Sequence, residues 1–407
     1  MLRTSFLLAA SVLSANAQSL YEALSKFPEL SDFAAFYSSN EALASAYFGN
    51  KSAYPITFLA PNNEAIANLQ QKLGVTLANI PIASLLEIVQ YHTLVSNLTT
   101  TDFDNGGKQG LTVPTMLNNG INNNRTVGVN LASRFGGPEK AAGQVVFIKG
   151  ADSGSPGRFR LMSRQDGGQP QSTIRSGLSS NVGIKALDNA EGLWEGGRFH
   201  IVDGLLTPPT TCVATIRGAG LENLDNALNR SMLWSALDGS KNITCLGPNN
   251  AAFRSAGTPD ASLNSTDLAQ AILFHTLPEV AYSDYLYDGQ EFKSLQNGTV
   301  RVKVVGEGKD REIYFNNAKV IDANVLTHNG LVHVLDAVML PLEQLNSTNA
   351  TSSAKPSSTP SATGSGSGTS ASGTPPASTG AAATVAAGLG EWNWTLWALL
   401  SSLFMMA

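Results

Sequence analysis

The stretch Tyr54–Ile66, YPITFLAPNNEAI, decides the fold, because nearly the same sequence returns at Asn242–Phe253 as NITCLGPNNAAF. Each copy contains a short apolar, β-prone run, which predicts a buried strand. A proline ends each run, Pro61 in the first copy and Pro248 in the second. The asparagines that follow can cap a helix, because their side-chain oxygen can accept hydrogen bonds from the free N–H groups of its first turn. Either member of each pair could be the cap: Asn62 or Asn63, and Asn249 or Asn250.

Two further blocks repeat in the same order, so the strand–helix corner belongs to a duplicated domain. Leu85–Leu94 (LLEIVQYHTL) matches Leu268–Leu277 (LAQAILFHTL), and the spacing of their apolar residues predicts a core-facing helix that ends at the histidine. Gly197–Pro209 (GRFHIVDGLLTPP) matches Gly330–Leu342 (GLVHVLDAVMLPL). The alternation of residues in this third block predicts a strand with one buried face.

The first copy is longer than the second. His92 and His275 are equivalent in the second block, and His200 and His333 are equivalent in the third. The third-block pair lies about 50 residues closer in sequence, so the first copy carries an insertion of that size between these blocks. The insertion includes Gly136–Gly177, where we expect an elaborated hairpin and a surface loop. This region is locally basic, and we expect either a solvated loop or a docking surface for an anionic partner at Arg134, Lys140, Lys149, Arg158, Arg160, Arg164 and Arg175.

The mixture of helical and β-prone segments indicates an α+β fold. In the second copy, Thr299–Val305 and Glu312–Phe315 are two more β-prone runs between the second and third blocks. Runs of strands combined with separate helices predict a largely antiparallel sheet packed with helices. We place the first domain, with its insertion, at residues 18–209 and the second at residues 210–343.

Both ends of the chain have the composition of processing signals. Residues 1–17 combine Arg3, an apolar stretch and a small-residue cleavage site before Gln18, which is typical of a secretory signal peptide rather than of a short buried helix. Residues 344–380 are rich in Ser, Thr and Pro, which predicts a solvated, O-glycosylated stalk. Residues 381–407 end in an apolar tail that is short for a transmembrane helix, so we expect a GPI-anchor propeptide rather than a membrane-spanning segment. The candidate attachment residues are Ser378, Gly380 and Gly388.

The composition narrows the classes of partner and site. A net charge of −5 without a run of Lys or Arg argues against a nucleic-acid partner. Cys212 and Cys245 predict one disulfide in a secreted chain, and they are too few for a structural zinc site. Asn-x-Ser/Thr sequons predict N-glycans on the surface at Asn50, Asn97, Asn124, Asn229, Asn242, Asn264, Asn297, Asn346 and Asn349.

The motifs TFLAPNNEAI, YHTL and FHIVDGLLTPP, in this order and at the scale of a domain, resemble the fasciclin domain. The second copy, with FHTL and NAKVIDANVLTHNGLVHVLDAVMLP, is similar to it as well, so the resemblance covers nearly all of residues 19–343. The resemblance implies two tandem fasciclin-like domains, each a mostly antiparallel β-wedge packed with helices. It also implies a secreted or surface-anchored protein that acts in adhesion or matrix binding rather than as an enzyme.

The resemblance also singles out the Tyr-His region as an adhesion determinant. The corresponding residues are Tyr91, His92, Phe274 and His275, and Phe274 stands where the family often has tyrosine. If these side chains are buried, their effect on adhesion is indirect and acts through folding. The first copy also departs from the family before its third block, where GLWEGGRFH replaces the usual Asn-Gly.

The repeated histidines and aspartates are the residues on which a catalytic interpretation would rest. We expect the histidines to be structural and hydrogen-bonded inside the domains, and the aspartates to be turn or cap residues: His92, His275, His200, His333, Asp203 and Asp336. The sequence contains no nucleophile elbow, phosphate-binding glycine loop or zinc-protease motif. We therefore expect no catalytic residues, metal or cofactor.

These observations favour a cell-surface adhesion protein, or one that binds matrix or cell wall. We expect it at the extracellular face of the plasma membrane through a GPI anchor, or in the cell wall, with cell-surface proteins, matrix proteins or wall glycans as partners. The alternative is an extracellular enzyme or small-ligand carrier housed in the elaborated first domain. A large apolar pocket with convergent polar side chains would favour that alternative.

Overall fold

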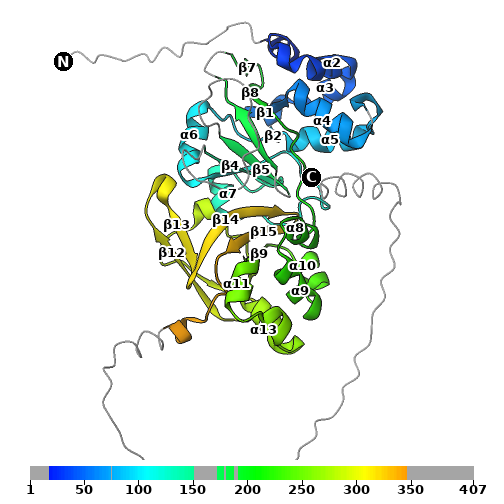
Figure 1. Ribbon diagram of the computed structural model, residues 1–407. Helices are drawn as coiled ribbons and strands as arrows, with labels where there is room; N and C mark the ends of the chain where they lie inside the picture. The colour runs from blue at the N-terminus through cyan, green and yellow to red at the C-terminus, as the bar shows by residue number, and fades with distance from the viewer. Residues whose placement is uncertain (1–17, 75, 151–171, 178–179, 188–190, 346–407) are drawn as a thin grey trace, which may run out of the picture. The chain divides into compact units, whose positions relative to one another are not determined.

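The computed structural model describes residues 18–74, 76–150, 172–177, 180–187 and 191–345, which contain both sequence repeats (Figure 1). The predicted signal peptide, nearly all of the stalk and the GPI-anchor segment lie outside the described residues. The same holds for several predicted site residues: Asn346, Asn349, Ser378, Gly380, Gly388, Arg158, Arg160 and Arg164.

Each repeat forms a sheet with the same strand order. The first follows the order β2 (Thr93–Leu94), β1 (Ile56–Pro61), β8 (Gly197–Val202), β6 (Ser180–Lys185), β5 (Thr173–Ser176), β4 (Val145–Lys149) and β3 (Leu111–Pro114). The second follows the order β10 (Thr276–Leu277), β9 (Ile243–Pro248), β15 (Gly330–Leu335), β14 (Ala318–Thr327), β13 (Glu312–Phe315), β12 (Thr299–Val305) and β11 (Glu291–Lys293). A further strand of the first repeat, β7 (Leu193–Trp194), pairs with β8. The equivalent strand orders confirm two copies of one fold.

The strand pairs are antiparallel except between the second and third strands of each order, where β1 pairs parallel with β8 and β9 pairs parallel with β15; these four strands are called the central strands below. The expected α+β class with a mostly antiparallel sheet is therefore confirmed. The expectation of one buried face in the third block was wrong for β15, which is buried along its whole length, and for the last four residues of β8. These strands have a paired strand on each side and apolar residues packed on both faces.

The helices of each repeat gather beside the central parallel strands (Figure 1). In the first repeat these helices are α1 (Leu20–Leu24), α2 (Ser31–Ser39), α3 (Glu41–Phe48), α4 (Asn63–Leu73) and α5 (Ile82–Tyr91). Two other helices of this repeat, α6 (Thr100–Gln109) and α7 (Val129–Arg134), do not belong to this group. In the second repeat the helices beside the central strands are α8 (Cys212–Gly218), α9 (Glu222–Arg230), α10 (Trp234–Gly239), α11 (Asn250–Ser255), α12 (Pro259–Ser262) and α13 (Ser265–Phe274). Short 3-10 turns lie at η1 (Pro28–Leu30), η2 (Lys51–Ala53), η3 (Leu77–Asn79), η4 (Ser283–Tyr285) and η5 (Gly308–Asp310).

Each repeat has two apolar clusters, one on either side of its central strands. In the first repeat, Phe58 and Phe199 of the central strands pack against the helices, whereas Leu59 packs with the antiparallel strands. In the second repeat, Val332 packs against the helices and Leu335 packs with the antiparallel strands. Alternation along the central strands thus supplies both clusters, because successive side chains of a strand point to opposite faces.

The two asparagines of each repeated corner cap two different helices. Asn62 Oδ1 accepts a hydrogen bond from Ala65 N at 2.8 Å and caps α4, the helix that follows it. Asn63 Oδ1 instead accepts from Asp32 N at 3.0 Å, in the first turn of the earlier helix α2. The sequence left open which asparagine is the cap, and the structure assigns one helix to each.

The second corner repeats this arrangement. Asn249 Oδ1 accepts from Ala252 N at 2.8 Å and caps α11. Asn250 Oδ1 accepts from Asn223 N at 3.1 Å, in the first turn of α9. The Asn-Asn pair therefore joins the strand, the helix after it and the lead-in helix at one point in both domains.

The third block begins with a glycine because two backbones meet there. A Cβ added to Gly330 would lie 1.8 Å from the carbonyl oxygen of Ile243 on the parallel partner strand. At the equivalent Gly197, whose φ is +134°, a Cβ would lie 2.1 Å from the carbonyl oxygen of Ile56. A side chain at either position would therefore push the central pair of strands apart.

The extra residues of the first repeat are spread over several connections between strands. Residues 115–144, including α7, connect β3 to β4, whereas only residues 294–298 connect β11 to β12. Residues 150–172 connect β4 to β5, whereas residues 306–311 connect β12 to β13. The expected hairpin is confirmed, because β4 and β5 pair antiparallel.

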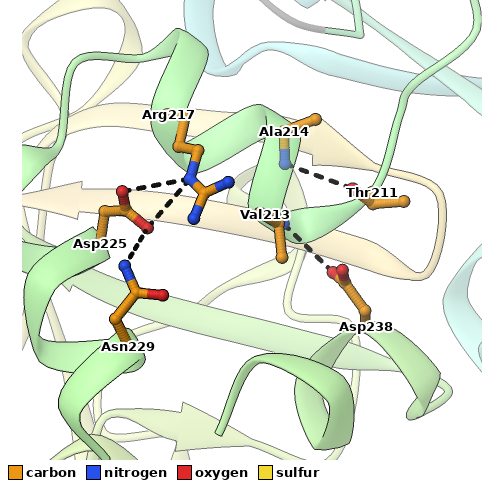
Figure 2. Close-up of polar contacts among 7 residues, drawn as sticks. All are labelled: Thr211, Val213, Ala214, Arg217, Asp225, Asn229 and Asp238. Atoms are coloured by element: carbon orange, nitrogen blue, oxygen red, sulfur yellow. Dashed lines mark hydrogen bonds and ion pairs between the residues drawn. The ribbon is translucent and has the colours of Figure 1, made fainter. Parts of the chain in front are cut away.

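The second repeat begins at α8, whose N-terminus is capped by Thr211 and held by Asp238 (Figure 2). Figure 2 also shows Arg217 of α8 paired with Asp225 of α9, with Nε 3.1 Å from the carboxylate. Asn229 donates to the same carboxylate at 3.3 Å. These contacts fix α8 against α9 before the chain enters β9.

The expected disulfide is not formed in the structure. Cys212 of α8 and Cys245 of β9 are free thiols, both buried in the apolar cluster between the helices and β9. Burial raises the pKa of both thiols, and the pKa of Cys245 reaches about 12. Both side chains therefore pack as small apolar groups in their protonated form.

Candidate functional site

The Tyr-His region expected to act in adhesion lies inside both domains. Tyr91 is 0% exposed, His92 is 1% exposed, and Phe274 and His275 are each 5% exposed. The Tyr91 hydroxyl donates to the Val145 carbonyl oxygen at 2.9 Å and so joins α5 to β4. These side chains cannot contact a partner from the folded state, so any effect on adhesion is indirect.

The helix-end histidines each bridge two backbone groups. His92 Nδ1 lies 2.7 Å from the carbonyl oxygen of Leu59, and His92 Nε2 accepts from Leu206 N at 2.9 Å. His275 Nδ1 lies 2.8 Å from the carbonyl oxygen of Ala271, and its Nε2 accepts from Met339 N at 2.9 Å. A nitrogen that faces a carbonyl must carry the proton and one that faces an N–H must not, so both rings are neutral.

The strand histidines make the same pair of bonds with the ring nitrogens exchanged. His200 Nε2 lies 2.9 Å from the Leu98 carbonyl oxygen, and Nδ1 accepts from Leu187 N at 3.0 Å. His333 Nε2 lies 2.8 Å from the Ala281 carbonyl oxygen, and its Nδ1 faces Asn324 N at 3.3 Å. Each ring holds irregular backbone that no ladder of strand hydrogen bonds supports.

Burial lowers the pKa of all four rings from 6.5 to about 4: His92, His200, His275 and His333. Their backbone hydrogen bonds oppose this shift only in part. With both nitrogens engaged by backbone, none is free to transfer a proton or to bind a metal. In the structure, each of these four histidines joins two backbone groups inside its domain.

The two aspartates of the third block fix the edge of a neighbouring strand. Asp203 lies just after β8, and its Oδ1 accepts from Gly183 N of β6 at 2.7 Å. Asp336 lies just after β15, and its Oδ1 accepts from Lys319 N of β14 at 2.8 Å. Both carboxylates thus replace a ladder hydrogen bond at the point where their own strand ends.

Among the described residues, no group of three or more His, Cys, Asp or Glu side chains could hold a metal ion. The same residues include no helix that is both long and apolar enough to cross a membrane.

A junction between the two repeats is the feature that sequence reasoning missed. Thr112 of β3 donates from its N–H at 2.9 Å and from its hydroxyl at 2.6 Å to the carboxylate of Asp284. The apolar cluster of the first repeat also includes Leu326 and Leu331 of the second. Burial raises the pKa of Asp284, although its bonds to Thr112 act in the opposite direction.

The inserted residues of the first repeat supply much of this junction. Arg175 pairs with Asp322 at 2.7 Å and donates to the Ala323 carbonyl oxygen at 2.7 Å. Asn124 N donates to the carbonyl oxygen of His328 at 2.7 Å. One basic residue of the suspected docking surface, Arg175, is therefore engaged inside the molecule and is unavailable to an external partner.

A cavity of about 260 Å³ opens beside the junction. Its apolar wall comes from Leu131 of α7 and from Tyr285 and Phe292 of the second repeat. Its polar lining includes Asn242 and Gln290. The lining contains one carboxylate, no lysine and no arginine, so the cavity suits an uncharged molecule with both apolar and hydroxyl surfaces.

The predicted glycosylation sites fall into two groups. Five side chains are exposed in the folded domains: Asn50, Asn97, Asn229, Asn264 and Asn297. Two are half-buried and lie at the junction: Asn124 and Asn242. Sequence alone could not separate these groups, because the junction joins residues that are more than a hundred positions apart.

Comparison with known proteins supports the structural assignment. The family described as Fasciclin domain matches residues 28–149 and residues 219–341. A fasciclin-like arabinogalactan protein of Arthroderma benhamiae is 31% identical over 148 residues, which are 36% of this chain and 34% of that protein. Human periostin is 23% identical over 296 residues, which are 70% of this chain and 28% of periostin.

A solved pair of domains from the insect cell adhesion molecule fasciclin I aligns with 77% of this chain and 98% of its own, at 16% identity and a TM-score of 0.33. The chain spans about a third of the length of the two curated relatives above. The family matches cover more than half of the chain and fall on the two repeats in turn. The chain therefore belongs to the fasciclin domain family and contains two fasciclin domains in tandem.

Proposed function

We propose that this chain acts by binding outside the cell, as an adhesion glycoprotein or one that binds matrix or cell wall. The observation that carries the proposal is the junction between the domains. It combines buried apolar contacts with the Thr112–Asp284 and Arg175–Asp322 pairs, which supports a pair of domains that presents one continuous exterior. Similarity to fasciclin-like arabinogalactan proteins and to periostin supports a role in cell-surface or matrix contacts.

The composition of two terminal segments supports a route to the cell surface. The apolar N-terminal segment supports secretion, and the Ser/Thr/Pro-rich stalk followed by a short apolar tail supports a GPI anchor. A glycosylated stalk would hold the domains away from the membrane. Many copies in one membrane would then engage matrix proteins, surface proteins or wall glycans with high avidity, even where each contact is weak.

Binding without catalysis is the simpler interpretation of the domain interiors. The repeated histidines have both ring nitrogens engaged by backbone, and the repeated aspartates hold strand edges. The cavity of about 260 Å³ is the observation that favours the alternative of a small-ligand carrier. It is smaller than most ligand pockets, which measure about 300–1,000 Å³.

The proposal is tested with the full chain displayed on cells that lack it. We expect displaying cells to aggregate or to attach to purified wall polysaccharide or matrix protein, and a phospholipase that cleaves GPI anchors to release the chain and abolish the effect. The control is a secreted chain that ends before the apolar tail. Surface display without any gain in aggregation or attachment would contradict the adhesive function. Retention after phospholipase treatment would contradict the anchor alone.

A further inference from the structure

Asn242 is a sequon asparagine that lies at the junction of the two domains. Its Oδ1 accepts a hydrogen bond from Thr126 N of the first domain at 2.7 Å. This bond fixes the plane of the amide and engages its oxygen, not Nδ2, the atom to which an N-glycan is attached. Asn242 also lines the cavity of about 260 Å³. The sequon side chain is thus held at the edge of a preformed cavity.

The walls of this cavity have the chemistry of a sugar site. The rings of Tyr285 and Phe292 offer aromatic surface to the apolar C–H face of a pyranose, and Leu131 and Leu286 extend this surface. Gln290, Glu279 and Asn130 offer hydrogen-bonding groups that suit hydroxyls and an N-acetyl group. The lining comes from both domains, so a molecule seated there would contact both.

We propose that an N-glycan on Asn242 places its first N-acetylhexosamine in this cavity and clamps the two domains together. The occupant is therefore part of the mature molecule. The inference rests on the secretory route of the proposed function, since the glycan is added there. The transfer forms a bond between Asn242 Nδ2 and C1 of the sugar and breaks the bond between C1 and the diphosphate of a lipid-linked donor. The Nδ2 proton leaves in the same step, and the amide oxygen stays free to accept from Thr126.

The exposed sequons provide internal controls. The Asn97 side chain is exposed, so a glycan there should extend into solvent. A glycan on Asn242 should instead bury its first sugar, while its outer sugars remain accessible. The two sites therefore differ in one property that can be measured on the same molecule, which is the accessibility of the bond between Nδ2 and the first sugar.

The test uses the full chain secreted from a glycosylating eukaryotic host and analysed by glycopeptide mass spectrometry. The folded protein is treated with a peptide-N-glycosidase, which cleaves the bond to Nδ2. We expect Asn97 to be released at least tenfold faster than Asn242, and the two rates to converge after denaturation. Equal release rates in the folded protein would overturn the inference. A glycan on Asn97 with none on Asn242 would also overturn it, while the secretory route would stand.

A thermodynamic cycle tests the contact itself. An endoglycosidase trims each glycan to one sugar, and Tyr285→Ala is then compared in the wild type and in Asn242→Gln. We expect Tyr285→Ala to lower the Tm more in the protein with the sugar on Asn242 than in Asn242→Gln, and the difference between the two shifts to be about 2 °C or more. The control cycle uses Asn97→Gln in place of Asn242→Gln. There, the effects of Tyr285→Ala and Asn97→Gln on the Tm should add. Additive effects in both cycles would refute the clamp, whatever the adhesion assays show.

Discussion

Acidification should destabilise this protein steeply because its buried histidines must be neutral. The folded pKa of each ring is about 4, whereas the ordinary value is 6.5. The unfolded chain therefore binds more protons between these values, so stability is complete above about pH 7 and falls as the pH drops toward 4. At pH 5, linkage gives a loss of about 2 kcal/mol for each histidine, or about 8 kcal/mol for the four. Each domain holds two of these rings, so its loss of about 4 kcal/mol is a large part of the stability of a typical domain, about 5–15 kcal/mol.

Some buried carboxylates act in the opposite direction and make this sum an upper bound. Burial raises the pKa of Asp203, Asp238 and Asp284. These groups take up protons more readily in the folded state, so they favour folding as the pH falls through their raised pKa values.

The assay is urea unfolding of the folded domains at pH 7.5 and pH 5.0. His333→Gln should be less stable than the wild type at pH 7.5 and should lose about 2 kcal/mol of the pH dependence. His328→Gln is the control: its ring is only half-buried, and we expect it to remove a smaller part. A total pH dependence below about 2 kcal/mol would refute the assignment of neutral, structural rings.

Four further substitutions test the corner, the central strands and the junction. Asn62→Ala and Asn63→Ala should each cost about 1 kcal/mol in urea unfolding, because each removes the cap of a different helix. Gly330→Ala should cost about 3 kcal/mol or more, because its Cβ meets a backbone oxygen at 1.8 Å, whereas Gly239→Ala should be tolerated since nothing lies within 4 Å. Thr112→Val should cost about 1–3 kcal/mol and separate the calorimetric transitions of the two domains, because a buried carboxylate loses a partner.

The repeated sequence blocks predicted the fold class, the equivalent strands and the structural role of the histidines. These features depend on local patterns: an apolar run before Asn-Asn, helical spacing before His92, and apolar residues around His200. Which helix each of Asn62 and Asn63 caps was not predictable from the sequence. The helix capped by Asn63, α2, lies about thirty residues earlier in the chain. Periodicity carries no information about such a contact.

The junction was not predictable for the same reason. Thr112 and Asp284 lie 172 positions apart, and neither belongs to a repeated block. The disulfide expected from cysteine counting is not formed in the structure, where both cysteines are free. The placement of Asn242 beside a cavity could be recognised only once the domains were assembled, although its sequon was plain in the sequence.

The most direct test of binding as the function is multivalent display of the folded pair, residues 18–343, made with native glycans and clustered on beads. Binding is measured to intact cells, to purified wall polysaccharides and between beads. We predict saturable binding that the soluble pair competes away, retained by His92→Gln per folded molecule because that ring is buried. Absence of binding at high valency on all three surfaces would contradict the account.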